Sequence, residues 1–191
     1  MIMQTEKQQT YSPQEYLDLE IEATDRHEYR NGEIIVMSGG TPNHNRITLN
    51  FGSVLNFSFK GQPYDVFITD QRLWIPSTKT YTYPDIMIVQ GEIQLQEGRN
   101  DIITNPLLIA EVLSQSTEAY DRGNKFTAYR TIPSLQEYIL IEQYRPHIEQ
   151  FSKTESGQWL LSDYDGKEAT ITLKSLSLEI SLSDIYDKVN F

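Results

Sequence analysis

The order of apolar and polar residues predicts helices and strands along the whole chain. Ser12 precedes Pro13, and Glu15 follows three positions after the serine, which is the signature of a capped helix start. Residues 26–37 are expected to form two strands joined at Asn31 and Gly32, the pair that most strongly favours a β-hairpin turn. A helix followed by a hairpin is therefore expected at the N-terminal end.

The rest of the chain alternates between strand and helix patterns. Apolar residues recur at helical spacing over 43–59 and again over 117–130, where Pro133 follows the second helix. Strands are expected at residues 64–75, 83–89, 107–113 and 137–142, with β-hairpins over 145–180 and a short helix near 183–187. This pattern favours an α+β, or α/β-like, fold in which helices flank a mixed central sheet.

The chain is long enough for one domain with a substantial core. It has 191 residues, of which 38% are hydrophobic, and it shows neither repeats nor a linker. We therefore expect a flexible polar arm over residues 1–10 and a single domain over 11–191. The first residues contain no apolar signal core, and no run approaches the length of a membrane span, so a soluble cytoplasmic protein without membrane contact is expected.

Composition excludes several kinds of site. The absence of cysteine removes disulfides, thiolate zinc sites, iron–sulfur clusters and cysteine nucleophiles. The three histidines are not spaced as a helical ligand pair, which disfavours a histidine-rich zinc site. Sixteen basic residues against 27 acidic ones give a formal charge of −11, which argues against nonspecific coating of nucleic acid or anionic membranes but allows a local basic groove.

One glutamate interrupts an apolar segment. Residues 107–113 are apolar except for Glu111, which is typical of a central strand covered on both faces. A lone carboxylate there costs several kcal/mol unless it is paired. Glu111 is therefore a candidate metal ligand or catalytic acid; the alternatives are a position at the strand end facing solvent or a bridge to an arginine.

A second acid precedes another apolar strand. Asp85 follows Pro84 and comes just before four apolar residues. By itself this arrangement is often a turn in which the carboxylate caps backbone amides. Together, Asp85 and Glu111 favour a hard cation, which takes carboxylate oxygens from adjacent strands.

The helix expected after the Glu111 strand carries further charged residues. Asp121 with Lys125, and Glu118 with Arg122, are spaced to form ion pairs on the helix surface. Gly123 between them weakens the helix, which indicates close approach of another segment at that position. Lys125 is long enough to reach back towards Glu111.

The chain carries the motifs YSPQEYL (11–17), RHEY (26–29), NGEI (31–34), PNHNRI (42–47), YPD (83–85), EVLSQST (111–117) and DRGNK (121–125). Their resemblance to the Uma-type restriction endonuclease family, a bacterial domain of unknown function within the PD-(D/E)XK nuclease superfamily, extends from about residue 11 to residue 150. It implies a restriction-endonuclease-like fold with an additional N-terminal helix and hairpin, and a site at one edge of the sheet.

The resemblance implies a nuclease site that uses Mg²⁺ or Mn²⁺. Asp85 and Glu111 would hold the cation with the backbone carbonyl of Val112, and Lys125 would orient a water molecule and stabilise charge on the phosphate. The protein would then be an endonuclease that hydrolyses DNA, and a homodimer because cutting two strands often uses two sites.

The sequence departs from the superfamily pattern at two positions. The signature lysine belongs two residues after the acid, where this chain has Leu113, so Lys125 on the following helix would replace it. The glutamate of the first helix has no match, and His44 stands in that helix instead. Asp70 and Asp121 are further candidate site residues.

Other interpretations remain open from the residues alone. Asp70 has a simpler interpretation as a partner of Arg72. The charge of −11 also favours a nuclease fold that no longer cuts and serves as a binding or assembly module. A hydrolase of a small phosphate ester would share the metal site without needing a DNA groove.

Overall fold

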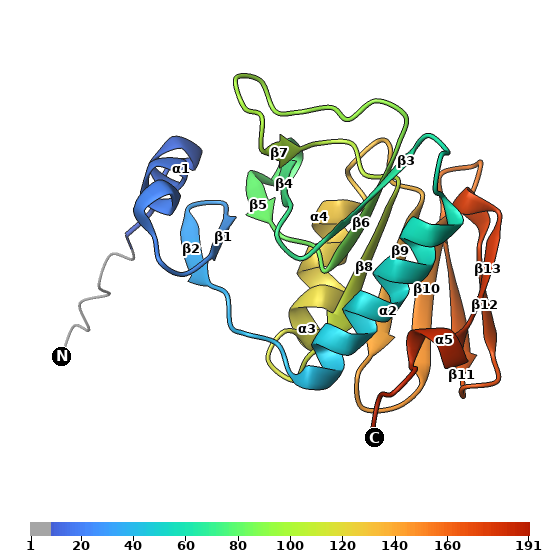
Figure 1. The fold of residues 1–191 in the computed structure, drawn as a ribbon. Coiled ribbons are helices and arrows are strands. Elements are labelled where there is room, and N and C mark those ends of the chain that lie inside the picture. The colour runs from blue at the N-terminus through green and yellow to red at the C-terminus, as the bar shows by residue number, and fades with distance from the viewer. Residues whose placement is uncertain (1–8) are drawn as a thin grey trace.

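A six-stranded mixed sheet forms the centre of the protein in the computed structural model, which describes residues 9–191 (Figure 1). The strand order is β11-β10-β9-β8-β6-β3; β8 and β9 are parallel and the other neighbours are antiparallel. The strands are β3 (Tyr64–Ile68), β6 (Ile86–Gln90), β8 (Leu108–Leu113), β9 (Glu137–Glu142), β10 (His147–Lys153) and β11 (Trp159–Asp165). The expected mixed sheet flanked by helices is thus confirmed.

One face of this sheet is covered by helices and by a small second sheet (Figure 1). The covering elements are α2 (Pro42–Ser58), α5 (Leu182–Ile185), β12 (Thr170–Leu173) and β13 (Leu178–Ser181), with a 3₁₀ turn at Lys174–Leu176 between the two strands. Leu108, Ala110 and Val112 of β8 pack into this core because alternate residues of a strand point to the same face.

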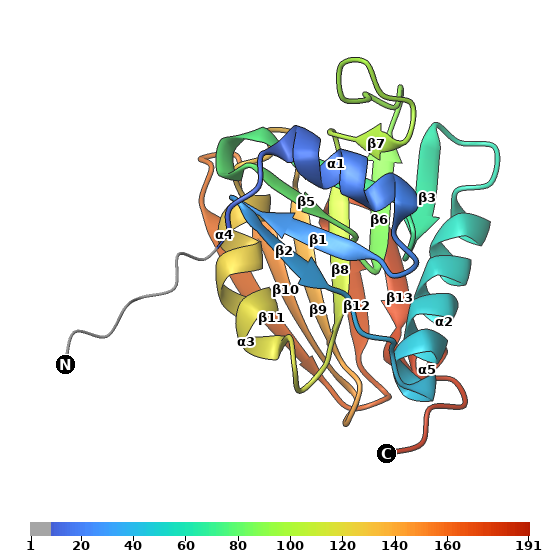
Figure 2. The ribbon, with the colours of Figure 1, turned by 90° about the vertical axis from the view of Figure 1, so that its left-hand side faces the viewer.

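The opposite face carries a short helical segment and a five-stranded sheet with the order β2-β1-β5-β4-β7. The helical elements are α3 (Glu118–Tyr120), a π-helical turn (Asp121–Lys125) and α4 (Phe126–Tyr129). The strands are β1 (His27–Arg30), β2 (Glu33–Val36), β4 (Arg72–Ile75), β5 (Thr80–Thr82) and β7 (Ile102–Ile103), with a 3₁₀ turn at Pro76–Thr78. Figure 2 shows α1 (Pro13–Glu22) and the β1–β2 hairpin lying across this face.

Local signals placed the N-terminal elements correctly. The backbone N–H of Glu15 donates to Ser12 Oγ at 3.2 Å, and the Ser12 N–H donates to the Glu15 carboxylate at 2.6 Å. Asn31 and Gly32 both have positive φ, 46° and 109°, as the two-residue turn of a hairpin requires. The predicted capping box and hairpin are confirmed.

Two of the predicted strands are shorter in the structure than the sequence pattern indicates. The strand expected over 64–75 is two strands in different sheets, because Thr69 takes a left-handed φ of 54° and turns the chain between β3 and β4. The strand expected from residue 83 begins at Ile86, so Asp85 lies just outside it. The sequence pattern does not reveal such a break, since apolar residues occur on both sides of it.

The two helical glycines meet different surroundings. A Cβ added at Gly52 of α2 would lie 2.8 Å from Ile68 Cγ2, whereas a Cβ at Gly123 would meet nothing within 4 Å. The close approach expected at Gly123 is therefore wrong, and the helix packs tightly against a neighbour at Gly52 instead.

The described part of the chain bears on two further expectations. Most of the arm expected over residues 1–10 lies outside the described residues, and Gln9 and Thr10 are exposed. A single domain over 11–191 stays a prediction. Within residues 9–191 no helix combines the length and apolarity needed to cross a bilayer.

Gly123→Ala is expected to raise the free energy of unfolding by about 0.5–1 kcal/mol, because it restricts the unfolded chain without creating a clash. Gly52→Ala should lower it, since the new methyl group would press on Ile68. Urea unfolding followed by circular dichroism measures both free energies. Equal effects of the two substitutions would contradict the conclusion that Gly52 is closely packed and Gly123 is not.

Candidate active site

A cavity of about 170 Å³ lies where β8 extends beyond the first residue of β6. The last antiparallel pair joins Ile86 to Ala110, so the edge of β8 is open from Glu111 onwards. Residues of the β1–β2 hairpin, the first turn of α2 and the π-helical turn complete the walls. The cavity thus gathers residues that range from Glu28 to Lys125 along the chain.

Asp85 is held at this open strand edge by the backbone. The N–H of Val112 donates to Asp85 Oδ2 at 2.8 Å, taking the place of the β6 residue that would otherwise pair there. His44 Nε2 lies 3.2 Å from the same carboxylate oxygen. Thr41 caps α2 by accepting the His44 N–H at 3.1 Å, which fixes the start of that helix beside the cavity.

His44 gains a preference for its protonated form. Burial opposes the charge, but the hydrogen bond to Asp85 and the attraction of Asp85 and Asp121 outweigh it and raise the pKa of His44. A charged His44 strengthens its contact with Asp85.

Glu111 is a buried acid with two donors on one oxygen. Its Oε1 lies 2.9 Å from Lys125 Nζ and accepts the Tyr129 hydroxyl at 2.7 Å. Burial raises the pKa of Glu111 to about 8, although the ammonium of Lys125 acts in the opposite direction. Glu111 faces the same side of the sheet as Ile109 and Leu113, so its carboxyl group points towards the π-helical turn.

Lys125 is buried among carboxylates. Its Nζ lies 2.9 Å from Glu111, 3.4 Å from Asp121 and 3.7 Å from Glu28. Burial disfavours the ammonium, but attraction to these three acids outweighs it and raises the pKa of Lys125 well above its usual value. Lys125 therefore stays charged.

The two expected helix-surface ion pairs have different outcomes. Asp121 and Lys125 do pair, but both are buried, so a surface location is wrong for them. The cause is that the π-helical turn points both side chains towards β8. Glu118 and Arg122 pair at 3.0 Å, where both side chains keep contact with solvent.

Glu28 is a cavity residue that the sequence did not single out. It is buried on β1, accepts hydrogen bonds from Arg30 and Thr82, and lies near Lys125. Burial raises its pKa, but attraction to Lys125 and the bonds from Thr82 and Arg30 outweigh this, so the pKa is lowered. The sequence offered one indication of Glu28, its place in the RHEY motif, where the next residue, Tyr29, packs in the core. The strand pattern alone gives no reason to connect Glu28 with Lys125.

The structure brings most of the singled-out residues together and leaves one apart. The cavity is lined, among others, by His44, Asp85, Glu111, Val112, Asp121 and Lys125. Asp70 is not among the described residues around it. Asp70 pairs with Arg26 at 2.8 Å rather than with Arg72, and its side chain is 68% exposed. Arg72 instead donates to the Tyr83 hydroxyl and lies near the carboxylates of Glu20 and Asp101.

The charges of the cavity suit a divalent cation. Its four carboxylates, set against Arg30 and Lys125, leave a formal charge of −2, or −1 when His44 is protonated. The contacts described above use Oδ2 of Asp85 and Oε1 of Glu111, which leaves one oxygen of each for a metal ion. Carboxylate and carbonyl oxygens are the ligands that Mg²⁺ and Mn²⁺ prefer.

Lys125→Met is expected to lower the free energy of unfolding by about 3–5 kcal/mol, because it leaves buried acids without their cation. Adding Glu111→Gln to it should recover part of this loss, since one of those acids is then neutral. Urea unfolding of the two single variants and the double variant measures the coupling; strictly additive losses would contradict a direct Lys125–Glu111 interaction.

Comparison with known proteins identifies relatives over nearly the whole chain. Two uncharacterized proteins of Synechocystis are similar in sequence. Sll1609 is 41% identical over 164 residues, which cover 86% of this chain and 93% of that protein. Slr1290 is 34% identical over 180 residues, which cover 94% and 93%.

The fold is shared with a crystal structure described as a putative nuclease of DUF820 from Anabaena variabilis. The TM-score is 0.78 at 21% identity, with 94% of this chain and 99% of the other covered. The model of the Uma2 family, described as "putative restriction endonuclease", matches residues 13–183. This chain therefore belongs to the Uma2 restriction-endonuclease-like family.

Proposed function

We propose that this protein is a metal-dependent endonuclease that hydrolyses phosphodiester bonds in DNA. The observation that carries the proposal is the meeting of Asp85, Glu111 and Lys125 in one cavity at the open edge of β8. Membership of a restriction-endonuclease-like family supports a nucleic acid as the substrate class.

The residues around the cavity fit Mg²⁺ or Mn²⁺. Asp85 and Glu111 would hold the ion, each with a carboxylate oxygen not used in the contacts above. The N–H of Val112 points to Asp85, and the C=O of a strand residue lies on the same strand edge as its N–H, so the Val112 carbonyl is the third ligand we propose. A bound cation of this kind polarises the phosphate and lowers the pKa of a water ligand.

Lys125 is the group that we propose acts on the reacting phosphate. Its ammonium is fixed by Glu28 and Asp121 as well as by Glu111, so it needs no reorganisation when substrate binds. It would orient the attacking water and stabilise charge on the phosphorane-like transition state. Because Lys125 is buried, this interaction is stronger than it would be in bulk water.

His44 has a supporting part in the proposal. Its contact with Asp85 Oδ2, together with the Val112 N–H, holds that carboxylate in one orientation. Asp121 acts on Lys125 in the same manner. Both residues are therefore proposed to position the groups that meet the metal and the phosphate.

A second candidate function is hydrolysis of a small phosphate ester. It is favoured by the cavity volume of about 170 Å³ and by the formal charge of −11, which weakens attraction to a DNA duplex. The same charge favours a third candidate, a binding or assembly module without activity. Endonucleolytic cutting of both strands would favour a homodimer with two sites.

Titration of Mn²⁺ in a calorimeter is the first test. Wild-type protein should give saturable binding, and Asp85→Ala/Glu111→Ala should abolish it because both carboxylate ligands are lost. Asp70→Ala, which removes an exposed acid outside the cavity, is the matched control and should bind as the wild type does. Absence of binding to the wild type, with and without DNA, would contradict the metal site.

Cleavage of supercoiled, linear and single-stranded DNA with Mg²⁺ or Mn²⁺ tests the activity. Asp85→Asn keeps the shape of the side chain but removes its charge, and we expect it to slow cleavage by about 100-fold or more. Turnover of a small phosphate diester without DNA cleavage would favour the second candidate. Metal binding with neither activity would favour the binding module.

The affinity for Mn²⁺ is expected to rise with pH. Since the raised pKa of Glu111 is about 8, the carboxyl group is protonated below that pH and the metal must displace its proton. Apparent affinity should therefore increase by up to about tenfold per pH unit below 8 and level off above it. Calorimetry between pH 6 and pH 9 measures the slope, and Glu111→Gln should remove it; an unchanged slope in that variant would contradict the assignment.

A further inference from the structure

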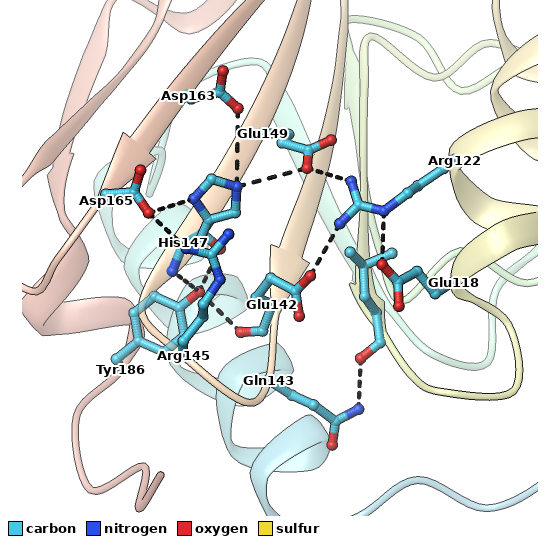
Figure 3. A network of polar contacts seen from close by, with 11 residues as sticks. Glu118, Arg122, Glu142, Gln143, Arg145, His147, Glu149, Asp163, Asp165 and Tyr186 are labelled. Carbon is cyan, nitrogen blue, oxygen red and sulfur yellow. Dashed lines mark hydrogen bonds and ion pairs between the residues drawn. The ribbon is translucent and has the colours of Figure 1, made fainter.

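A second group of ionisable side chains lies at the other end of the large sheet, on β10 and the edge strand β11 (Figure 3). His147 and Glu149 are two residues apart on β10 and share a face. In the antiparallel register, Glu149 is opposite Asp163 and His147 is opposite Asp165. Four side chains that meet across two strands thus form one cluster.

The two ring nitrogens of His147 have different surroundings: Nδ1 contacts Asp165, and Nε2 faces Glu149 and Asp163. Its side chain is 8% exposed, and Nδ1 lies 2.7 Å from Asp165 Oδ1. An N–H on Nδ1 that donates to this carboxylate leaves a lone pair on Nε2. That is the arrangement in which a carboxylate orients a histidine that binds metal through its other nitrogen.

Nε2 faces two further acids at distances too long for hydrogen bonds. It lies 3.6 Å from Glu149 Oε1 and 3.9 Å from Asp163 Oδ1. Around a tetrahedral zinc ion with bonds of about 2.0–2.2 Å, ligand atoms are about 3.3–3.6 Å apart. The two distances from Nε2 are within a few tenths of an ångström of that geometry, and one ligand atom from each of the three residues lies within 4.8 Å of the others.

The surrounding charges favour a cation. The three glutamates and two aspartates labelled in Figure 3, set against two arginines, leave a formal charge of −3. Arg122 contacts Glu149 Oε1, the oxygen that lies 3.6 Å from Nε2, and also pairs with Glu142, so a metal ion at this site either shares Oε1 with Arg122 or binds Oε2. Asp163 is half-exposed, so an ion has a route from solvent.

We infer that His147, Glu149 and Asp163 bind a transition-metal ion of the zinc type, separate from the cavity at Asp85 and Glu111. An imidazole ligand favours Zn²⁺, Co²⁺ or Ni²⁺ over Mg²⁺, which prefers oxygen ligands alone. The ion fastens β11 to β10 at the sheet edge. Glu149, one of its ligands, also pairs with Arg122, which lies in the π-helical turn that carries Lys125.

Calorimetric titration of the full chain with ZnCl₂ tests this site. We expect saturable zinc binding in the wild type, including one site whose affinity is lower by at least about tenfold in Asp163→Asn, which loses a charged ligand at a half-exposed position. Asp187→Asn, a substitution of the same type at an exposed residue in the turn after α5, is the matched control and should leave zinc affinity unchanged. MgCl₂ should give no heat that depends on Asp163.

Two further measurements separate this site from the cavity and from a general effect on folding. Asp85→Asn should retain zinc binding at His147, so this measurement tests the zinc site separately from the proposed nuclease function. Co²⁺ should give the visible absorption of a tetrahedral complex, and Asp165→Asn should weaken binding by about 10–100-fold by removing the orienting partner of His147. The inference is overturned if wild-type protein binds no zinc, if Asp163→Asn binds it equally well, or if Asp85→Asn abolishes binding.

Discussion

The buried ammonium of Lys125 is the interaction on which both the fold and the candidate site depend. It joins Glu28 of the N-terminal hairpin, Glu111 of the central strand and Asp121 of the π-helical turn. A buried charge is tolerated only when it is paired, so separation of these three elements would leave the ammonium either exposed to solvent or buried without a partner. The hairpin, which also pairs with β5, is thereby held over the cavity, and Glu111 belongs both to these acids and to the proposed metal site.

The unequal lengths of neighbouring strands provide the second constraint. Because β6 begins only opposite Ala110, the edge of β8 beyond it lacks a strand partner, and Asp85 satisfies that edge through the Val112 N–H. The backbone thus positions a carboxylate next to Glu111 without a dedicated loop. At the far side of the sheet, His147 and its acidic neighbours are likewise brought together by strand register.

Local sequence signals predicted those elements whose causes are themselves local. The capping box at Ser12, the Asn31-Gly32 hairpin turn and the apolar run around Glu111 each depend on residues a few positions apart, and each was placed correctly. The strand expected over 64–75 was wrong because a single left-handed residue, Thr69, divides two apolar stretches. The expected pair of Asp70 with Arg72 was wrong because both residues meet partners from distant segments, Arg26 for Asp70 and Tyr83 for Arg72.

The sequence by itself determined the fold family, the order of most elements and the presence of acids in strands that have no room for unpaired charge. Only the tertiary structure decided that Glu28 meets Lys125, that Asp121 and Lys125 point inwards, and that His147 faces acids from a neighbouring strand. The physical reason is that strand register and the packing of distant segments set these contacts. Periodicity shows which face of an element is buried, but it does not show which other element covers that face.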